Sequence, residues 1–515
     1  MQERLENASN GAPTVLIGDR ALHSRYNPER EAERYIASLS LDQSIRYFIL
    51  IEPGLGYCIP FLKRRFPDSA FLSLHISDFF TQTDIPHGEY GLELLEPRES
   101  WSPKQGPLQE FLEQNLPDME ASMVKVIEWR PALAVYGGDY ARILAETLEF
   151  IKRIDANART IKNFGLRWVK NFFKNLRLLN RVYVLNLTVC QEMPWIITGA
   201  GPSLEEAIAD IHGLSRGCVI LAAASSAPAL LAKGVFPDFI LATDGGSWAL
   251  LHLYESIRAH SPGDAAPVLV MTMNAAIPSH YATGHILPVA DGSLWQHILL
   301  TALGIPFLSL PQRGTVTASA LDLAAGLHCR SIILAGMDLD NRDIKTHAHP
   351  YSFNRLQEES ATRLAPRYSQ GYLRAKLIGG SGSASVYRDW FKRRLARDPV
   401  PIYSLGKNHP LFEEFAQGEA QGHVQGMDTL EMPVTRSGAA GMVRAMEGEN
   451  RISQALGILQ KALEDRSIEN RIIAELAPLL YSGSAAKETT ISSAMLMQDL
   501  REICAPYLAA QQSAV

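Results

Sequence analysis

Residues 195–203, with the sequence Trp195-Ile-Ile-Thr-Gly-Ala-Gly-Pro-Ser203, decide the fold of the central part of this chain. The apolar start contains two adjacent β-branched residues, which predicts a buried strand. Gly199 and Gly201 follow at once, and they allow a tight turn while leaving no Cβ between the backbone and a ligand. The stretch therefore predicts a strand that ends in a glycine turn.

A helix is expected directly after this turn. Ser203 is a candidate N-cap and Glu206 completes a capping-box pattern, so the helix should begin at Leu204. A helix that starts on a glycine turn presents free backbone N–H groups to a phosphate. An ordinary tight turn is the alternative, because no third glycine completes the G-x-G-x-x-G pattern and Glu205 and Glu206 place negative charge in the first helical turn.

The length and composition of the chain limit the number of domains, the classes of partner and the compartment. A chain of 515 residues is too long for one core and predicts about two to four domains. The net charge of −6 favours neither a nucleic acid nor an anionic membrane as partner, and no apolar stretch is suited to span a membrane. The first residues, Met1-Gln-Glu-Arg-Leu-Glu-Asn7, lack the basic-then-apolar pattern of a signal peptide. The five cysteines form no C-x-x-C pair, so we expect neither a disulfide framework nor a zinc site. Scattered cysteines fit a reducing compartment, so we expect a cytoplasmic location.

We expect four segments: an N-terminal α/β domain over residues 1–150, a helical linker over 151–190, a central domain over 191–410 and a C-terminal helical domain over 411–515. In the first, an apolar strand (47–51) leads into Glu52-Pro-Gly-Leu-Gly-Tyr57, and a second strand ends near Asp78. This order resembles a nucleotide- or S-adenosylmethionine-binding half. Because Pro53 interrupts the motif, a structural Rossmann-like domain is favoured over a cofactor site.

The linker is basic and rich in asparagine. Apolar residues at 164, 168, 172 and 176 are four apart and predict one helical stripe. The simplest interpretation of the charges is a solvated face, and a basic groove for an anionic sugar or nucleotide is the alternative.

The central domain alternates apolar runs with helical segments. Five further runs predict buried strands, at residues 219–224, 236–244, 268–273, 286–289 and 332–337. Such alternation predicts a parallel sheet, in which ligands bind outside the carboxyl ends of the strands. Residues suited to a site fall at these strand ends or at helix starts: Gly199, Gly201, Ser225, Asp244, Gly314, Thr315 and Asp338.

A polar loop with two histidines, His347 and His349, follows Asp338. Imidazole titrates near neutral pH, so such a loop is suited to proton transfer. A metal site and histidines without a role are the alternatives, and no third metal ligand follows at a recognised spacing. The glycine- and serine-rich stretch that ends at residue 385 is either a lid or a plain connector. From residue 439 onward helical spacing dominates and predicts a helical bundle.

Taken together, these motifs resemble the motility accessory factor glycosyltransferases, bacterial enzymes that glycosylate flagellins, with their glycine-turn central domain. The motifs stand in the family's order, at residues 199–204, 237–238, 244, 314–316, 336–339, 347–348 and 385–391. The resemblance includes His23-Ser-Arg-Tyr-Asn-Pro28 and covers most of the chain to about residue 410. Met337 stands where the family has glutamine.

The resemblance implies a sialyltransferase-like, Rossmann-like central sheet. It also implies cytoplasmic transfer of a nonulosonic acid, pseudaminic- or legionaminic-like, from its CMP form to serine or threonine of flagellin. It places the CMP on Gly199, Ala200, Gly201, Pro202, Ser203, Ser225, Gly314 and Thr315. Asp244 and Asp338 would set the site's geometry, and His347 would transfer a proton or contact the phosphate. No resident cofactor is implied, the need for a divalent metal stays open, and the C-terminal helices are a candidate groove for flagellin.

Three other functions stay open. A pterin pyrophosphokinase would use ATP and magnesium, with Asp244 and Asp338 holding the metal. A methyltransferase would bind S-adenosylmethionine at residues 52–57. A flagellin-binding scaffold would keep the fold without the chemistry.

Overall fold

The structure is a computed structural model that describes residues 3–81, 99–180, 182–185, 187–258, 267–279, 285–339, 344–380, 387–388, 390–391, 394, 400–405, 440–443, 450–481 and 491–512. The expected boundary near residue 410 and the end of the glycine- and serine-rich stretch lie outside these residues. The chain forms two compact units, residues 1–163 and 164–515. Helix α5 (Gly138–Leu176) begins in the first unit and ends in the second.

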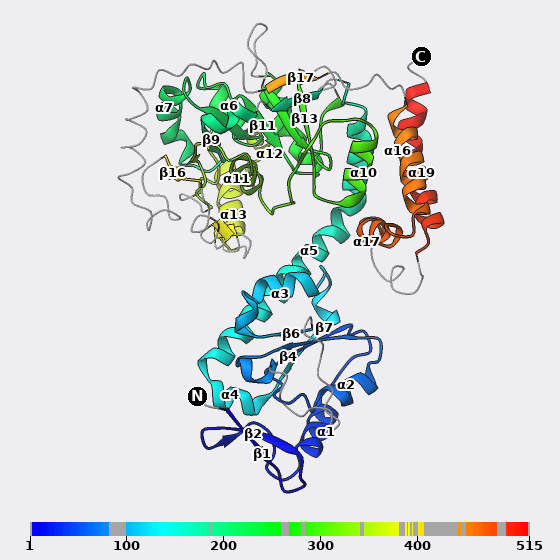
Figure 1. Ribbon diagram of the computed structural model, residues 1–515. Helices are drawn as coiled ribbons and strands as arrows, with labels where there is room; N and C mark the ends of the chain where they lie inside the picture. The colour runs from blue at the N-terminus through cyan, green and yellow to red at the C-terminus, as the bar shows by residue number, and fades with distance from the viewer. Residues whose placement is uncertain are drawn as a thin grey trace. The chain divides into compact units, whose positions relative to one another are not determined.

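The first unit contains two sheets (Figure 1). An antiparallel sheet comprises β1 (Glu3–Asn7), β2 (Pro13–Ile17) and β3 (Arg20–Ala21). A parallel sheet has the order β6-β5-β4-β7, formed by β6 (Ser100–Trp101), β5 (Ala70–Leu74), β4 (Tyr47–Ile51) and β7 (Val124–Glu128). The helices are α1 (Pro28–Ser38), α2 (Ile59–Arg65), α3 (Leu108–Asn115), α4 (Arg130–Tyr136), η1 (Asp78–Thr81), η3 (Pro103–Gln105) and η4 (Ala121–Met123). In chain order the parallel sheet is 3-2-1-4, as in the first half of a Rossmann fold.

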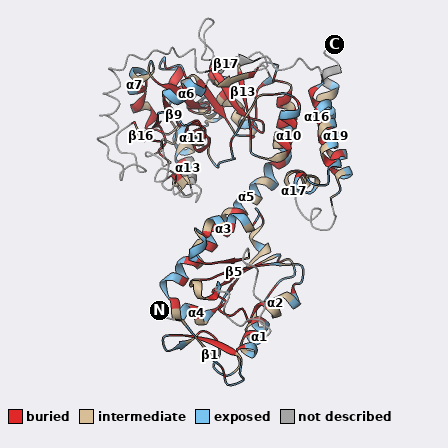
Figure 2. Ribbon diagram, viewed as in Figure 1, coloured by how far each residue is buried: buried red, intermediate tan, exposed pale blue. Residues whose placement is uncertain are grey.

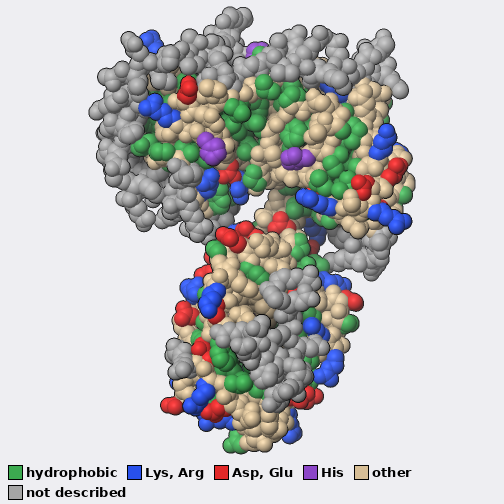
Figure 3. Space-filling model, in the orientation of Figure 1, with side chains coloured by type: hydrophobic (Ala, Val, Ile, Leu, Met, Phe, Trp, Pro, Cys, Tyr) green, Lys and Arg blue, Asp and Glu red, His purple; other side chains and the backbone are tan. Residues whose placement is uncertain are grey.

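The exposed surface of this unit is mixed in charge. Figure 3 shows Lys and Arg interspersed with Asp and Glu over its visible face. Inside, β4 is buried on both faces, with Phe48, Ile49 and Ile51 at 0% exposure. A strand covered on both sides has a continuous apolar sequence, which is why residues 47–51 could be predicted.

The second unit is built on one large sheet. Within the described residues its strand order is β16-β15-β9-β10-β11-β12-β13-β8-β17, and β14 pairs with β13. The strands are β8 (Val182–Leu185), β9 (Pro194–Thr198), β10 (Val219–Ala223), β11 (Phe239–Ala242), β12 (Val268–Thr272), β13 (Ile286–Ala290), β14 (Leu308–Ser309), β15 (Ser331–Ala335), β16 (Ile402–Ser404) and β17 (Ala440–Val443). The pairs from β16 to β8 are parallel, so the predicted α/β fold with a central parallel sheet is confirmed.

Alternate residues of the strands face two separate cores. In β9, Trp195 and Ile197 belong to one core and Ile196 to the other. Helix α11 (Val316–Gly326) covers the first face. The other face is covered by the end of α5 with α7 (Leu204–Leu214), α8 (Ala227–Leu231) and α10 (Leu294–Ala302). Figure 2 shows the strands as buried and the outer faces of these helices as exposed.

The remaining helices of this unit are α6 (Leu187–Glu192), η5 (Ser247–Ala249), α9 (Leu250–Arg258), α12 (Asn354–Ser360), α13 (Arg367–Gly380), α16 (Arg451–Glu464), α17 (Glu469–Leu480) and α19 (Ser493–Gln512). The predicted helical C-terminal region is confirmed, and α16 lies between α10 and α19 (Figure 1). Along α16, the predicted stripe Ile452, Leu456, Leu459 and Leu463 is buried.

The expectation that helical spacing dominates from residue 439 onward is wrong at its start. Residues 440–443 form β17, which pairs antiparallel with β8. Four residues are too few for a periodicity to separate strand from helix, so only the pairing with β8 defines this strand.

In the part of the chain that the structure describes, no helix has both the length and the apolar character needed to cross a membrane.

Candidate functional site

The strand order of the large sheet reverses at β9. From β9 the chain continues through β10, β11, β12 and β13 on one side, and it returns to place β15 on the other side. Such a switch point is where open parallel sheets bind ligands, outside the carboxyl ends of the two strands. The glycine turn at Gly199–Ser203 and the segment Gly336–Asp338 both lie at this point, because they follow β9 and β15 directly.

The two segments are in backbone contact. Gly199 N–H donates to the carbonyl of Ala335 at 2.8 Å, and Gly201 N–H donates to the carbonyl of Gly336 at 2.8 Å. A Cβ on Gly199 would lie 2.5 Å from the Gly336 oxygen, and a Cβ on Gly201 would overlap the carboxylate of Asp338. The glycines are therefore required for the contact between the β9 and β15 loops. The prediction that this turn presents free N–H groups to a phosphate is wrong for Gly199 and Gly201, because both donate to the β15 loop.

Asp338 is the anion at the start of α7. It is 5% exposed, and its Oδ2 accepts from the Ser203 N–H at 3.1 Å and from the Ser203 hydroxyl at 2.7 Å. A carboxylate is stabilised there by the helix dipole. Helix α7 begins at Leu204 as predicted, but the predicted capping box is wrong: Ser203 has helical dihedrals and makes no side-chain cap bond, since its hydroxyl is bonded to Asp338.

Residues 344–353, here called the histidine loop, are held over the start of α7 by Glu205. One carboxylate oxygen of Glu205 accepts from Lys345 Nζ at 2.5 Å, and the other accepts from the His349 N–H at 2.5 Å. Burial acts to raise the pKa of Glu205, but these two hydrogen bonds outweigh it and hold the pKa below its ordinary value. Between them, Ala348 N–H donates to the carbonyl of Ala200 at 2.9 Å. The loop is thus attached on both sides of His347, to the first turn of α7 through Lys345 and His349 and to the glycine turn through Ala348.

His347 itself is half-buried and oriented. Its Nδ1 shares a hydrogen bond of 2.8 Å with the Thr346 hydroxyl, and its ring stacks on Tyr351 at 4.0 Å between centroids, with 13° between the planes. An imidazole held in this way is suited to proton transfer to or from a bound group.

A cluster of rings connects the histidine loop to the segment after β11. His252 packs against Tyr351 at 5.5 Å and Phe353 at 5.3 Å, and its Nδ1 lies 3.0 Å from the Ser352 hydroxyl. Burial lowers the pKa of His252 to about 4, with Asp244 acting in the opposite direction, so this imidazole is neutral at pH 7. His347 thus belongs to the same ring cluster as His252, whose pKa Asp244 influences.

Asp244 is exposed, and its Oδ1 accepts from the Gly246 N–H at 2.7 Å. Ser225 is half-buried, while its neighbour Ser226 is buried and lies 2.9 Å from the Thr198 hydroxyl, linking β10 to β9. Thr315 caps helix α11 by accepting from Ala318 N–H at 3.1 Å. This helix packs against β9 and β10, so its start lies at the same edge of the sheet.

Sequence reasoning missed the role of the asparagines in α5. Asn171 donates to the carbonyls of Gly245 and Asn274, at 3.1 and 2.9 Å. Asn175, fully buried, donates to the carbonyls of Met273 and Ala275, at 3.0 and 2.8 Å. These side chains fix the loops after β11 and β12, a role that the solvated-face interpretation of the charges did not consider. The available signal was their spacing of four, beside the apolar stripe.

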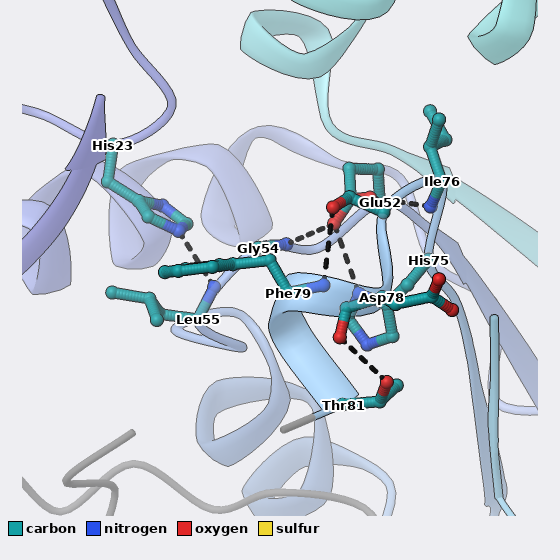
Figure 4. A network of polar contacts seen from close by, with 10 residues as sticks. His23, Glu52, Gly54, Leu55, His75, Ile76, Asp78, Phe79 and Thr81 are labelled. Carbon is teal, nitrogen blue, oxygen red and sulfur yellow. Dashed lines mark hydrogen bonds and ion pairs between the residues drawn. The ribbon is translucent and has the colours of Figure 1, made fainter. Parts of the chain in front are cut away.

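The glycine turn of the first unit is occupied by the chain's own side chains (Figure 4). Glu52 is fully buried; its carboxylate accepts from the N–H groups of Gly54 at 3.3 Å and Ile76 at 2.7 Å, and lies 3.0 Å from His75 Nδ1. His23 Nε2 accepts from Leu55 N–H at 3.0 Å, and its ring fills the place of a Gly54 Cβ. These contacts favour a structural role for residues 52–57.

Comparison with known proteins places these observations in context. Residues 167–343 match the family described as 6-hydroxymethylpterin diphosphokinase MptE-like. An uncharacterised protein of Treponema pallidum is 29% identical over 338 residues, which is 64% of this chain and 69% of that protein. A 6-hydroxymethyl-7,8-dihydropterin pyrophosphokinase of Methanothermobacter thermautotrophicus is 32% identical over 146 residues, which is 28% of this chain and 56% of that enzyme.

The fold has a counterpart among solved structures. A MAf glycosyltransferase from Magnetospirillum magneticum AMB-1 superposes with a TM-score of 0.50 and 13% identity, over 99% of this chain and 87% of that one. At this identity the likeness concerns the fold. The chain is thus similar in sequence to the MptE-like family over residues 167–343, and similar in fold to a MAf glycosyltransferase over nearly its whole length.

Proposed function

We propose that this protein is a glycosyltransferase that moves a nonulosonic acid, pseudaminic- or legionaminic-like, from its CMP-activated form to serine or threonine of flagellin in the cytoplasm. The observation that carries the proposal is the attachment of the histidine loop at the β9/β15 switch point, to Ala200 of the glycine turn and to Glu205 of helix α7. The likeness in fold to a MAf glycosyltransferase supports it.

The donor nucleotide would lie along the carboxyl edge of the sheet, on residues 199–203, Ser225, Gly314 and Thr315. A CMP-sugar leaves with one phosphate, so transfer needs positioning of the two substrates and stabilisation of the departing anion more than covalent chemistry. Asp338 would keep the glycine turn in position for the donor, since its carboxylate accepts from the N–H and the hydroxyl of Ser203.

The acceptor hydroxyl must lose its proton as the sugar is transferred. His347 would take this proton, because its ring is oriented by Thr346 and Tyr351 and its loop is held at the glycine turn. Asp244 would contribute a fixed negative charge from the loop after β11.

The test is transfer by the purified full-length chain, given a CMP-nonulosonic acid and unmodified flagellin, with the mass of flagellin as the readout. We expect an increase by the mass of the sugar residue, lost in His347→Ala and Asp244→Ala. Glu359→Gln, which removes an exposed carboxylate of α12, is the matched control and should retain activity. Wild-type transfer by the variant that carries both alanines would refute the catalytic roles of His347 and Asp244. No mass increase with the wild type would refute the transferase and leave a scaffold.

A pterin pyrophosphokinase is the second candidate, favoured by the match of residues 167–343 to the MptE-like family. It would transfer a diphosphate from ATP to 6-hydroxymethyl-7,8-dihydropterin and release AMP, with magnesium held by carboxylates. Among the described residues, no three His, Cys, Asp or Glu side chains are grouped as metal ligands. AMP release that requires the pterin, with no transfer from a CMP-sugar, would replace the first proposal by this one.

A further inference from the structure

Trp248 is unusually exposed for its size and place. It is 65% exposed, and it lies in η5, directly after the Gly245-Gly246 segment that follows β11. This is the carboxyl edge of the sheet, where ligands of parallel sheets bind. An indole in water at that edge offers a flat apolar surface to a ligand.

The indole is supported from one side. Its ring lies 6.3 Å from that of Phe353 between centroids. Phe353 in turn packs on His252 and Tyr351, at 5.3 and 5.4 Å, and the hydrogen bond between His252 and Ser352 holds this layer across the two segments. Trp248 is therefore the exposed end of a cluster of rings that contact one another at tilted angles.

The other end of the cluster lies at the candidate site. Tyr351 stacks on His347 at 4.0 Å, and the adjacent Ala348 is bonded to Ala200 of the glycine turn. The indole is thus connected to the turn by a continuous series of packed rings and one backbone hydrogen bond. Asp244, four residues before Trp248, presents an exposed carboxylate from the same segment.

We propose that Trp248 binds the planar heterocycle of the donor by stacking, so that the ring cluster from Trp248 to His347 sets the distance between the base and the reacting groups. The assignment of the heterocycle as cytosine rests on the proposed function. Stacking on an aromatic side chain is available to every base, because every base has a π-face. The Asp244 carboxylate can accept a hydrogen bond from an exocyclic amine, which cytosine carries. The indole and the carboxylate together therefore suit a nucleobase that carries an exocyclic amine.

The test is a calorimetric titration of the full-length chain with CMP, for the wild type, Trp248→Phe and Trp248→Ala. The Kd of Trp248→Ala should rise about 5- to 150-fold, while Trp248→Phe, which retains a stacking ring, should stay within about 5-fold. Tyr254→Ala removes a second exposed ring, 38% exposed, from the same region and should leave the Kd unchanged. Titration with CMP should also quench tryptophan emission in the wild type and less in Trp248→Phe.

The outcomes separate this inference from the proposed function. Wild-type affinity for CMP in Trp248→Ala would overturn the stacking role and leave the glycosyltransferase proposal intact. If the wild type binds 6-hydroxymethylpterin or ATP and not CMP, and Trp248→Ala weakens that binding, the stacking role holds and the CMP donor is wrong. A wild type that binds none of CMP, ATP and the pterin would overturn both.

Discussion

Replacing Gly201 by alanine should destabilise the second unit strongly. The new Cβ would overlap Asp338 Oδ2 and lie 2.8 Å from the carbonyl oxygen of Gly336. The carboxylate can move only by giving up its two hydrogen bonds from Ser203, and the carbonyl can move only by giving up the bond from the Gly201 N–H. Hydrogen bonds to a charged group contribute about 1.5–3 kcal/mol each, so we expect a loss of about 3–5 kcal/mol in the free energy of unfolding.

The assay is differential scanning calorimetry of the full-length chain, with Gly213→Ala as the control. Gly213 lies near the end of the same helix, α7, and a Cβ there would meet nothing within 4 Å. Alanine should stabilise this helical position by about 0.5–1 kcal/mol. The two substitutions add the same methyl group and should shift the transition of the second unit in opposite directions.

A Gly201→Ala protein as stable as the wild type would refute the reasoning, because it would mean that the β9 and β15 loops are not in the close contact described. Gly213→Ala with a large loss would also count against it, since the effect would then follow from alanine in this region and not from the overlap with Asp338.

Three further predictions follow from other contacts. Glu205 holds the loop that carries His347, so Glu205→Gln should lower the kcat of the proposed transfer about 10- to 100-fold in steady-state kinetics, with little change in the donor KM. A rise in the donor KM without a fall in kcat would contradict this. Burial lowers the pKa of His23 to about 3, so below pH 6.5 the unfolded chain binds a proton that the folded chain does not, and the free energy of unfolding should fall by about 1.4 kcal/mol per pH unit. Urea titrations should show a smaller fall between pH 7 and pH 5 in His23→Gln than in the wild type. An equal fall in both proteins would reject the assignment to His23. Gly165→Ala should cost about 1–3 kcal/mol in thermal unfolding, because its Cβ would lie 2.6 Å from the backbone of helix α17, whereas Gly457→Ala, with open space, should cost nothing.

The inner strands β4, β5, β9, β10, β11, β12, β13 and β15 were predictable because they are covered on both faces, whereas β6, β7, β8, β14 and β16 were not predicted. A strand buried on both sides is a continuous apolar run, and polar or glycine residues follow it where it leaves the core. This is why the ends of β9, β11 and β15 could be named in advance, together with Gly201, Asp244 and Asp338. The start of α7 at Leu204 was also correct.

Other features have no local signal. Trp248 was not noted, because a single tryptophan in a sequence is as suited to a core as to a surface, and its 65% exposure depends on what packs around it. Glu205 was considered only as a charge in the first turn of a helix, since its partners Lys345 and His349 are 140 and 144 residues away. Strand β17 exists through its pairing with β8.

The sequence alone thus determined the α/β class, most central strands and the set of polar residues at their ends, because burial on a regular element leaves a local periodicity in the chain. The tertiary structure decided what those residues bond to. Ser203, predicted as a helix cap, instead bonds to Asp338, 135 residues away. The Ser203 hydroxyl could accept from a helix N–H as a cap, or donate to a carboxylate as it does here. Which of these occurs depends on the distance to Asp338 that the packing of β9 beside β15 creates, and no local pattern contains that distance.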